Sequence, residues 1–536
     1  MLFKSKDIWN IVMNRFFIVI HISLVLISCQ NESKNSDKHI FRYNSATGIT
    51  SLDPAFARTQ ENIRTVNQLF NGLVSLDSNL NIVPDLAQRW TISENGLLYT
   101  FHLRNDVFFH NDPVFKNVPR RLKAQDFVYS FGRLLDPKVA SDGAWIFNGV
   151  VNDEQPFLAI NDSTFQIQLK KPFAPFLSML TMAYCYVVPR EAVEHYKKDF
   201  GKHPVSTGLF KFGNWQDGIR LNLIRNENYF DTTVTTNIDA ISVSFIQSKQ
   251  TELLEFLQGN LSIFSGLESS YKDEVLNANG SLNPKYAKQF QLVKSPFLNT
   301  EYLAFNLEDK QSPLYDKNLR KAMSLAIDRE VMVKYLRNSI GTPALGGFIP
   351  KGLPMFNDSL LLPNLTLAKT YLEQSSYSGE KVTLTTTKDY LDLCILAQKN
   401  LADIGINIKV DVVPSSLLKQ QKSSGKLAFF RSSWIADYPD GENYLACFYS
   451  KNKAPNGPNY TRFSNERFDE LYLQLVQESA PEKRNKIANQ MEKIMLDECP
   501  FILLFYDESF WLHRNEVKGI TINSLNHLSL KNVVLN

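Results

Sequence analysis

The amino-acid sequence predicts a mixed α/β protein with more than one domain, and three observations support this. The chain has 536 residues, which is enough for several domains. Stretches in which apolar and polar residues alternate recur along the chain, as expected for half-buried β-strands. Stretches with apolar residues at helical spacing lie between them, so strands and helices are interleaved.

The strand pattern is clearest in four segments, which are 99–105, 163–171, 219–225 and 406–413. In the second of these, Phe165, Ile167 and Leu169 alternate with polar residues, so one face of the strand is apolar. Each segment is therefore expected to pair into a sheet with one face on a core.

Two longer segments carry helical stripes. In 316–338 the apolar residues share one face, namely Leu319, Ala322, Met323, Ala326 and Ile327. In 479–500 Pro481 suits a first helical turn, Pro500 ends the helix, and the stripe consists of Ile487, Met491, Ile494 and Met495.

The N-terminus resembles a bacterial lipoprotein signal. A basic start is followed by the apolar run from Phe16 to Ser28, which is short for a membrane span and suits a signal peptide. The sequence LISC then ends at Cys29, as in a lipobox, so Cys29 is expected to be acylated and to anchor the protein in a lipid bilayer. The alternatives are an ordinary signal peptide with an incidental cysteine, or an uncleaved anchor helix. The polar segment 30–39 would be the tether.

Charge and cysteine usage exclude several classes of function. The net charge is +3 and no stretch clusters Lys and Arg, so nucleic acid is not expected as a partner. Cys185, Cys394, Cys447 and Cys499 show no CxxC and no Cys/His pairing, so neither a metal site nor a cofactor is expected. We expect four small buried residues there, although an oxidising compartment permits a disulfide.

Six segments, in order, resemble the family 5 extracellular solute-binding proteins of ABC importers, which include oligopeptide- and dipeptide-binding proteins. They are Ser51–Trp90, which begins SLDP; Tyr99–Pro137; Ser206–Phe230; Tyr302–Glu330; Phe429–Leu445, which contains WIADYPD; and Cys499–Gly519. The resemblance covers almost the whole chain after Cys29.

This resemblance implies a class II, large periplasmic-binding-protein-like fold: two lobes, an additional middle domain and a hinge, with the ligand enclosed when the lobes close. The expected division is 1–28 signal peptide, 29–40 tether, 41–70 with 190–297 and 510–536 as lobe I, 71–189 middle domain and 298–509 lobe II. It implies an exported lipoprotein of the periplasm or cell envelope that delivers peptides to the transmembrane subunits of an ABC permease.

The resemblance also names candidate ligand-binding residues in WIADYPD. Asp437 corresponds to the aspartate that pairs with a peptide's α-ammonium group, which needs an anion when buried. Trp434 would form a wall beside the ligand, and the backbone at Ser432 and Ser433 would bond an extended peptide. The competing interpretations are that Asp437 is a turn residue and that Trp434 belongs to the lobe core.

Four further charged or aromatic residues are candidates with more than one possible role. Arg431 is expected either to meet a ligand carboxylate or to pair with Asp437 or Asp440. Asp440 is otherwise a loop or hinge carboxylate. Trp145 of the middle domain is a candidate for covering the ligand, with core or surface as the alternative, and Arg58 lies either near the cleft or in solvent.

Alternative functions use other ligands or another mode of action. The same fold binds sugars, nickel chelates or haem in other members, and a ligand sensor without transport is a further possibility. An enzyme is not expected, because the sequence has no G-x-S-x-G, no H-E-x-x-H and no P-loop.

Overall fold

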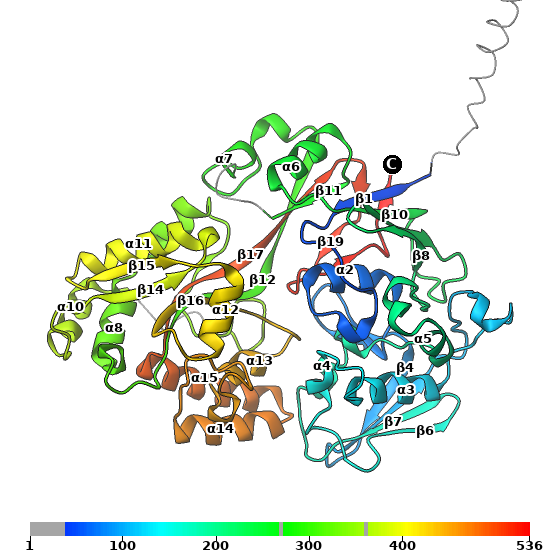
Figure 1. Cartoon of the computed structure of the whole chain (residues 1–536), viewed down its shortest axis with the longest axis horizontal. Coiled ribbons are helices and arrows are strands. Elements are labelled where there is room, and N and C mark those ends of the chain that lie inside the picture. Colours follow the sequence, from blue (N-terminus) through cyan, green and yellow to red (C-terminus); the bar gives the residue numbers. More distant parts are fainter. Residues whose placement is uncertain (1–37, 267–271, 358–362) are drawn as a thin grey trace, which may run out of the picture.

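The computed structural model describes residues 38–266, 272–357 and 363–536. It shows a mixed α/β fold with two lobes, which confirms the predicted fold class (Figure 1). The predicted signal peptide, Cys29 and most of the tether lie outside the described residues.

Lobe I contains a four-stranded sheet in the order β1 (Ile40–Asn44), β10 (Ala240–Ser244), β9 (Arg220–Arg225) and β8 (Phe210–Gln216). The pairing of β1 with β10 is parallel, and the others are antiparallel. The alternation predicted for 219–225 is confirmed, because Leu221 and Leu223 are buried in β9. The lobe's helices are α2 (Gln60–Leu69), α5 (Arg190–Tyr196), α6 (Lys249–Gln258) and α7 (Lys272–Val275).

A second four-stranded sheet is antiparallel, in the order β4 (Ala87–Ile92), β5 (Leu98–Leu103), β7 (Thr164–Gln168) and β6 (Phe157–Asn161). Helix α3 (Ala124–Leu135) packs on it, with the Phe127 and Phe131 rings against Phe165. One apolar core continues from this sheet into lobe I. Short elements complete this part, namely β2 (Val74–Leu76), β3 (Ile82–Pro84) and α4 (Phe176–Met179).

The largest sheet runs in the order β11 (Ile263–Ser265), β17 (Phe501–Arg514), β12 (Phe290–Phe305), β16 (Phe429–Ile435), β14 (Val382–Thr386) and β15 (Ile408–Val412), and β13 (Thr342–Pro343) also pairs with β17. Separate apolar cores cover the two faces of its lobe II half. The surrounding helices are α8 (Lys317–Ala326), α9 (Arg329–Val331), α10 (Leu365–Glu373), α11 (Leu391–Ala402), α12 (Ser415–Ser423), α13 (Glu442–Leu445), α14 (Glu466–Gln477) and α15 (Pro481–Glu498).

Strands β12 and β17 connect the two lobes, running side by side between the halves of the molecule (Figure 1). Their antiparallel register shifts between Pro296 and Thr300, where proline cannot donate a ladder hydrogen bond. This irregularity lies between the lobe I half, in which β17 pairs with β11, and the lobe II half, in which β12 pairs with β16. The C-terminal tail then forms β18 (Val517–Lys518), β19 (Thr521–Ile522), β20 (Leu528–Ser529) and β21 (Val534–Leu535).

The helical stripe predicted over 316–338 is confirmed only as far as Ala326. Helix α8 ends there, and a short helix, α9, with a π-helical turn at Met332–Leu336 follows. The buried Arg329 guanidinium accounts for the break, because it donates to the carbonyl oxygens of Ser324 and Ile327 at 3.1 Å each. The side chain of Asp328 then caps the new turn by accepting from the Val331 N–H.

The other predictions for these elements hold. Helix α15 begins at Pro481 and ends at Glu498, with Met491 and Met495 buried. Cys185, Cys394, Cys447 and Cys499 are free and buried, as expected.

Within the described ranges no helix is long and apolar enough to span a membrane, and no group of His, Cys, Asp and Glu side chains is placed to hold a metal ion.

Candidate ligand-binding site

Strand β16 has one open edge at the centre of lobe II. On one side it pairs with β12 along its whole length, whereas on the other side β14 pairs only with Phe429 and Phe430. Strand β14 ends at Thr386 and the chain turns away into a 3₁₀ turn at Lys388–Tyr390. In the described part of the chain, no other strand pairs with this edge beyond Phe430.

The direction of the backbone groups on β16 follows from two hydrogen bonds to β12. The Ala436 N–H donates to the Leu298 carbonyl, and the Ala428 carbonyl accepts from the Asn306 N–H, each at 2.9 Å. Backbone groups of successive residues point to opposite edges of a strand, so Ala428 and Ala436 face β12 while Ser433 and Ile435 face the open edge. Ser433 thus lies where a peptide strand can add, whereas the backbone of Ser432 faces β12.

Asp437 lies just beyond this edge and keeps an exposed surface although protein atoms surround it. Burial raises the pKa of Asp437 to about 6, opposed by a hydrogen bond from Asn443. Among the described residues, no Lys, Arg or His forms an ion pair with it. A solvent-reachable carboxylate without an opposite charge is suited to receive a cation from a ligand.

Asn443 of α13 holds the two main predicted residues together. Its side-chain oxygen accepts from the Trp434 indole N–H at 2.9 Å and from the Asp437 backbone N–H at 3.1 Å. Its side-chain nitrogen donates to Asp437 Oδ2 at 3.4 Å. Trp434 is partly buried and packs against the lobe II core, so both of its predicted roles fit. Sequence reasoning missed Asn443, although it lies only six residues after Asp437.

The predicted intramolecular partners of Arg431 are wrong. Its guanidinium pairs with Glu301 of β12, through Nε at 3.0 Å and also through one terminal nitrogen, and lies 3.2 Å from the centre of the Tyr390 ring. Asp440 is instead paired with Arg484 at 2.7 Å and 2.9 Å. Because β16 aligns Leu303 with Arg431 and Ser433 with Glu301, the pair forms diagonally across adjacent strands. The expectation that Arg431 meets a ligand carboxylate stays a prediction.

Trp145, from the predicted middle domain, contacts the loop of lobe II that contains Asp437. Its ring centre lies 6.3 Å from that of Tyr438, the residue after Asp437, and its side chain is 42% exposed. Burial raises the pKa of the nearby Tyr184, and the negative charges of Asp142 and Asp437 raise it further. Tyr184 is therefore close to charged groups from both sides of the site. Arg58 pairs with Asp142 at 3.4 Å and its side chain is 62% exposed, so its position agrees with the solvent-facing alternative as well as with one near the cleft.

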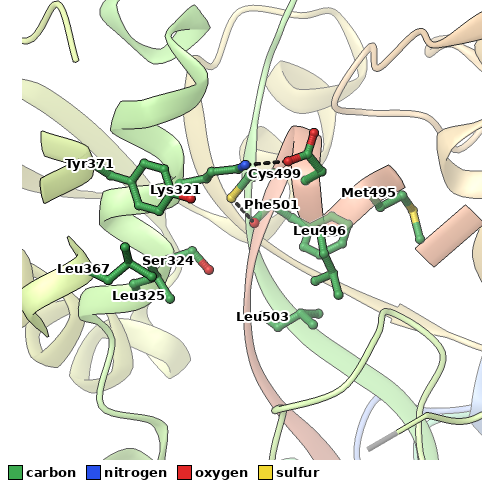
Figure 2. A pocket seen from close by; sticks show the side chains of 11 residues that line it. Lys321, Ser324, Leu325, Leu367, Tyr371, Met495, Leu496, Cys499, Phe501 and Leu503 are labelled. Carbon is green, nitrogen blue, oxygen red and sulfur yellow. Dashed lines mark hydrogen bonds and ion pairs between the residues drawn. The ribbon is translucent and has the colours of Figure 1, made fainter. Parts of the chain in front are cut away.

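Two hollows lie away from these residues. One, of about 240 Å³, lies in lobe II between α8, α10 and the end of α15, and its apolar lining includes Leu325 and Leu367 on one side and Leu503 on the other (Figure 2). Its main charged groups are Lys321 and Asp497, which pair with each other at 2.5 Å. The other, of about 670 Å³, lies between lobe I and α3. Neither includes a predicted site residue, so the β16 edge remains the candidate site.

Comparison with known proteins identifies the family of this chain. The family model for bacterial extracellular solute-binding proteins, family 5 Middle, matches residues 81–456. The dipeptide-binding protein DppE of Bacillus subtilis is 24% identical, covering 98% of this chain and 99% of its own. Heme-binding protein A of Haemophilus influenzae is 26% identical, covering 92% and 91%. The solved structure of DppA from Helicobacter pylori with the peptide STSA has the same fold, with a TM-score of 0.77, 23% identity, and coverage of 94% and 99%. The chain therefore belongs to the bacterial extracellular solute-binding proteins of family 5.

Proposed function

We propose that the protein captures short peptides between its two lobes and delivers them to an ABC permease. The observation that carries this proposal is the open edge of β16, which leads to the unpaired carboxylate of Asp437. An extended peptide on this edge would bond the backbone groups of Ser433 and Ile435, and its α-ammonium group would meet Asp437. Backbone bonding reads no side chain, so one site accepts many sequences.

The energetics favour an amine at Asp437. An α-ammonium group is charged near neutral pH, and enclosing it between lobes is costly without an anion. A hydrogen bond between charged partners contributes roughly 1.5–3 kcal/mol. Because Asn443 and Trp434 already position Asp437, little further ordering is needed when the ligand binds.

The relatives support a peptide ligand, and one of them indicates which alternative ligand should be tested. DppE is a dipeptide-binding protein by name, and DppA from Helicobacter pylori was solved with a peptide. Heme-binding protein A is named for binding haem, so haem is the non-peptide ligand to test in the same assay.

The remaining parts of the function follow from the N-terminal signal and the family. We propose that Cys29 is acylated and holds the mature protein at the surface of a bilayer. The domain division given above, with lobe II at 298–509, is part of the same proposal. The protein is expected to bind and release its ligand without catalysing a reaction.

The test pairs a change in the protein with a change in the ligand. Tetra-alanine with a free N-terminus is expected to bind at least about tenfold more tightly than its N-acetylated form, since 1.4 kcal/mol corresponds to a factor of ten. Asp437→Asn should weaken binding of the free form by a similar factor and remove the difference between the two ligands. Isothermal titration calorimetry on ligand-stripped protein measures both.

The matched control is Asp403→Asn, an exposed aspartate at the end of α11, which should leave both affinities unchanged. Equal affinity of wild type and Asp437→Asn for free tetra-alanine would exclude the assigned role. Binding of haem with no peptide binding would replace the peptide proposal.

A further inference from the structure

Lys422 is a second charged group beside β16 that lacks an opposite charge. It lies in the last turn of α12, and its Nζ is 3.2 Å from the Ser432 hydroxyl oxygen of β16. The same Nζ lies 4.5 Å from the centre of the Tyr460 ring. The side chain is only partly exposed, so its charge is held against the protein rather than extended into solvent.

The surroundings of Lys422 do not neutralise it. Within the described ranges, no Asp or Glu lies at ion-pair distance from its Nζ. Arg431 and Lys419 are like charges nearby, and Glu301, which has the opposite sign, is already paired with Arg431. A partly buried ammonium group without a carboxylate is costly, which distinguishes Lys422 from the neutralised Arg431.

The open edge of β16 directs ligand side chains toward this group. Side chains alternate between the two faces of a strand, so Ser432 and Trp434 share one face and Arg431 and Ser433 the other. A peptide added at the edge follows the same alternation, because directly opposite residues in adjacent strands share a face. Every second ligand side chain therefore points to the face where Lys422 meets Ser432.

We propose that Lys422 binds a carboxylate of the ligand, so that the receptor prefers peptides that place a carboxylate beside Ser432. This rests on the proposed peptide-binding function, and it names the residue that adds selectivity to backbone bonding. The carboxylate comes either from an Asp or Glu side chain on the Ser432 face or from the C-terminus of a short ligand. Both sources carry the same charge and supply the oxygen acceptors that an ammonium group needs.

The experiment uses tetra-alanine, its C-terminal amide, and tetra-alanine derivatives with Glu or Gln at each of the four positions. Affinities are measured for wild type, Lys422→Met, Lys422→Arg and the control Lys426→Met, whose lysine is exposed just beyond α12. For a side-chain carboxylate, Glu is expected to bind about tenfold more tightly than Gln at one position or at alternate positions. Lys422→Met should remove this preference, whereas Lys422→Arg and Lys426→Met should keep it.

A second measurement uses the pH dependence of the Glu-to-Gln affinity ratio. Burial lowers the pKa of Lys422 to about 8, the charges of Arg431 and Lys419 act in the same direction, and Cys447 and Glu301 oppose it. The ratio should therefore fall as the pH rises from 7 to 9. In Lys422→Arg it should stay constant, because a guanidinium keeps its charge throughout this range.

The outcomes separate this inference from the function on which it rests. If wild type prefers free tetra-alanine to its amide and Lys422→Met removes that preference, the C-terminal carboxylate is the source. If tetra-alanine binds and the Glu-to-Gln and acid-to-amide ratios are the same in wild type and Lys422→Met, the role of Lys422 is excluded while the peptide proposal stands. If no peptide binds to wild type, both fall together.

Discussion

At the scale of single residues, Asp437 differs from most surface aspartates because its pKa is raised to about 6 by burial. Below that pH the empty site is protonated, so binding an ammonium group there must also release a proton. Peptide affinity is therefore expected to fall as the pH drops below about 6, by up to tenfold per pH unit. It should fall again above about 8, where the ligand's α-amino group loses its charge. Calorimetry of tetra-alanine between pH 4.5 and 9 measures both limbs.

Asp437→Asn serves as the control for the acid limb, because an amide does not titrate in this range. The variant should bind more weakly at pH 7 and show no decrease in affinity between pH 7 and 5. An acid limb of the same size in this variant would assign the titration to another group.

At the scale of elements, the important feature is the length difference between β14 and β16. Since β14 stops pairing at Phe430, the backbone groups of Ser433 and Ile435 lie on an edge where a ligand strand can add. A ligand whose N-terminus is at Asp437 runs antiparallel to β16. Every second ligand amide then bonds the edge.

The expected result is an alternating effect of N-methylation along a tetrapeptide, measured by competition against a labelled ligand. N-methylation at one amide should weaken binding by about tenfold or more, because it removes a donor and adds bulk against the strand. Methylation of the adjacent amide should have little effect. A uniform loss at all positions would indicate that the ligand is not added as a strand.

At the scale of the whole molecule, the two sides of the site contact each other through Trp145 and Tyr438. Tyr438 is held firmly, because its hydroxyl donates to Glu442 Oε2 at 2.6 Å, while burial raises the pKa of Glu442 to about 7. The backbone bond from Ala174 N–H to the Val476 carbonyl, at 2.7 Å, joins the same two sides. Because these contacts join the two sides of the site, we expect them to break when the lobes move apart about β12 and β17.

Trp145→Ala is expected to speed peptide release roughly two- to tenfold, since an aromatic pair contributes about 0.5–1.5 kcal/mol. Its effect on the melting temperature of the empty protein should be small, because the side chain is 42% exposed. Stopped-flow dissociation measures the rate, with Trp145→Phe expected to retain slow release. Ile92→Ala, at a residue 45% exposed in the same part of the chain, is the control. An unchanged release rate in Trp145→Ala would show that this contact does not hold the lobes closed.

The sequence by itself determined the mixed α/β class, the strands of segments 99–105 and 163–171, and helix α15. These depend on periodicity and on end signals such as Pro481, which act over a few neighbouring residues. It also singled out the segment around Asp437, through the resemblance of WIADYPD to a segment of the solute-binding family. Helix α8 is shorter than its apolar periodicity predicts. The buried guanidinium of Arg329 ends the helix by binding carbonyl oxygens of its last turn, and periodicity carries no information about such contacts.

Only the tertiary structure decided which charged and aromatic groups at the site already have a partner within the protein. Arg431 forms an ion pair with Glu301, which is 130 residues away in the sequence. The ring of Trp145 packs near that of Tyr438, although the two residues belong to different parts of the fold. Asp437 and Lys422 have no oppositely charged partner among the described residues, and nothing in their local sequences shows this difference from Arg431. The physical reason is that charge compensation depends on which distant elements pack together. Packing follows from the whole set of strand pairings, and no local pattern carries that information.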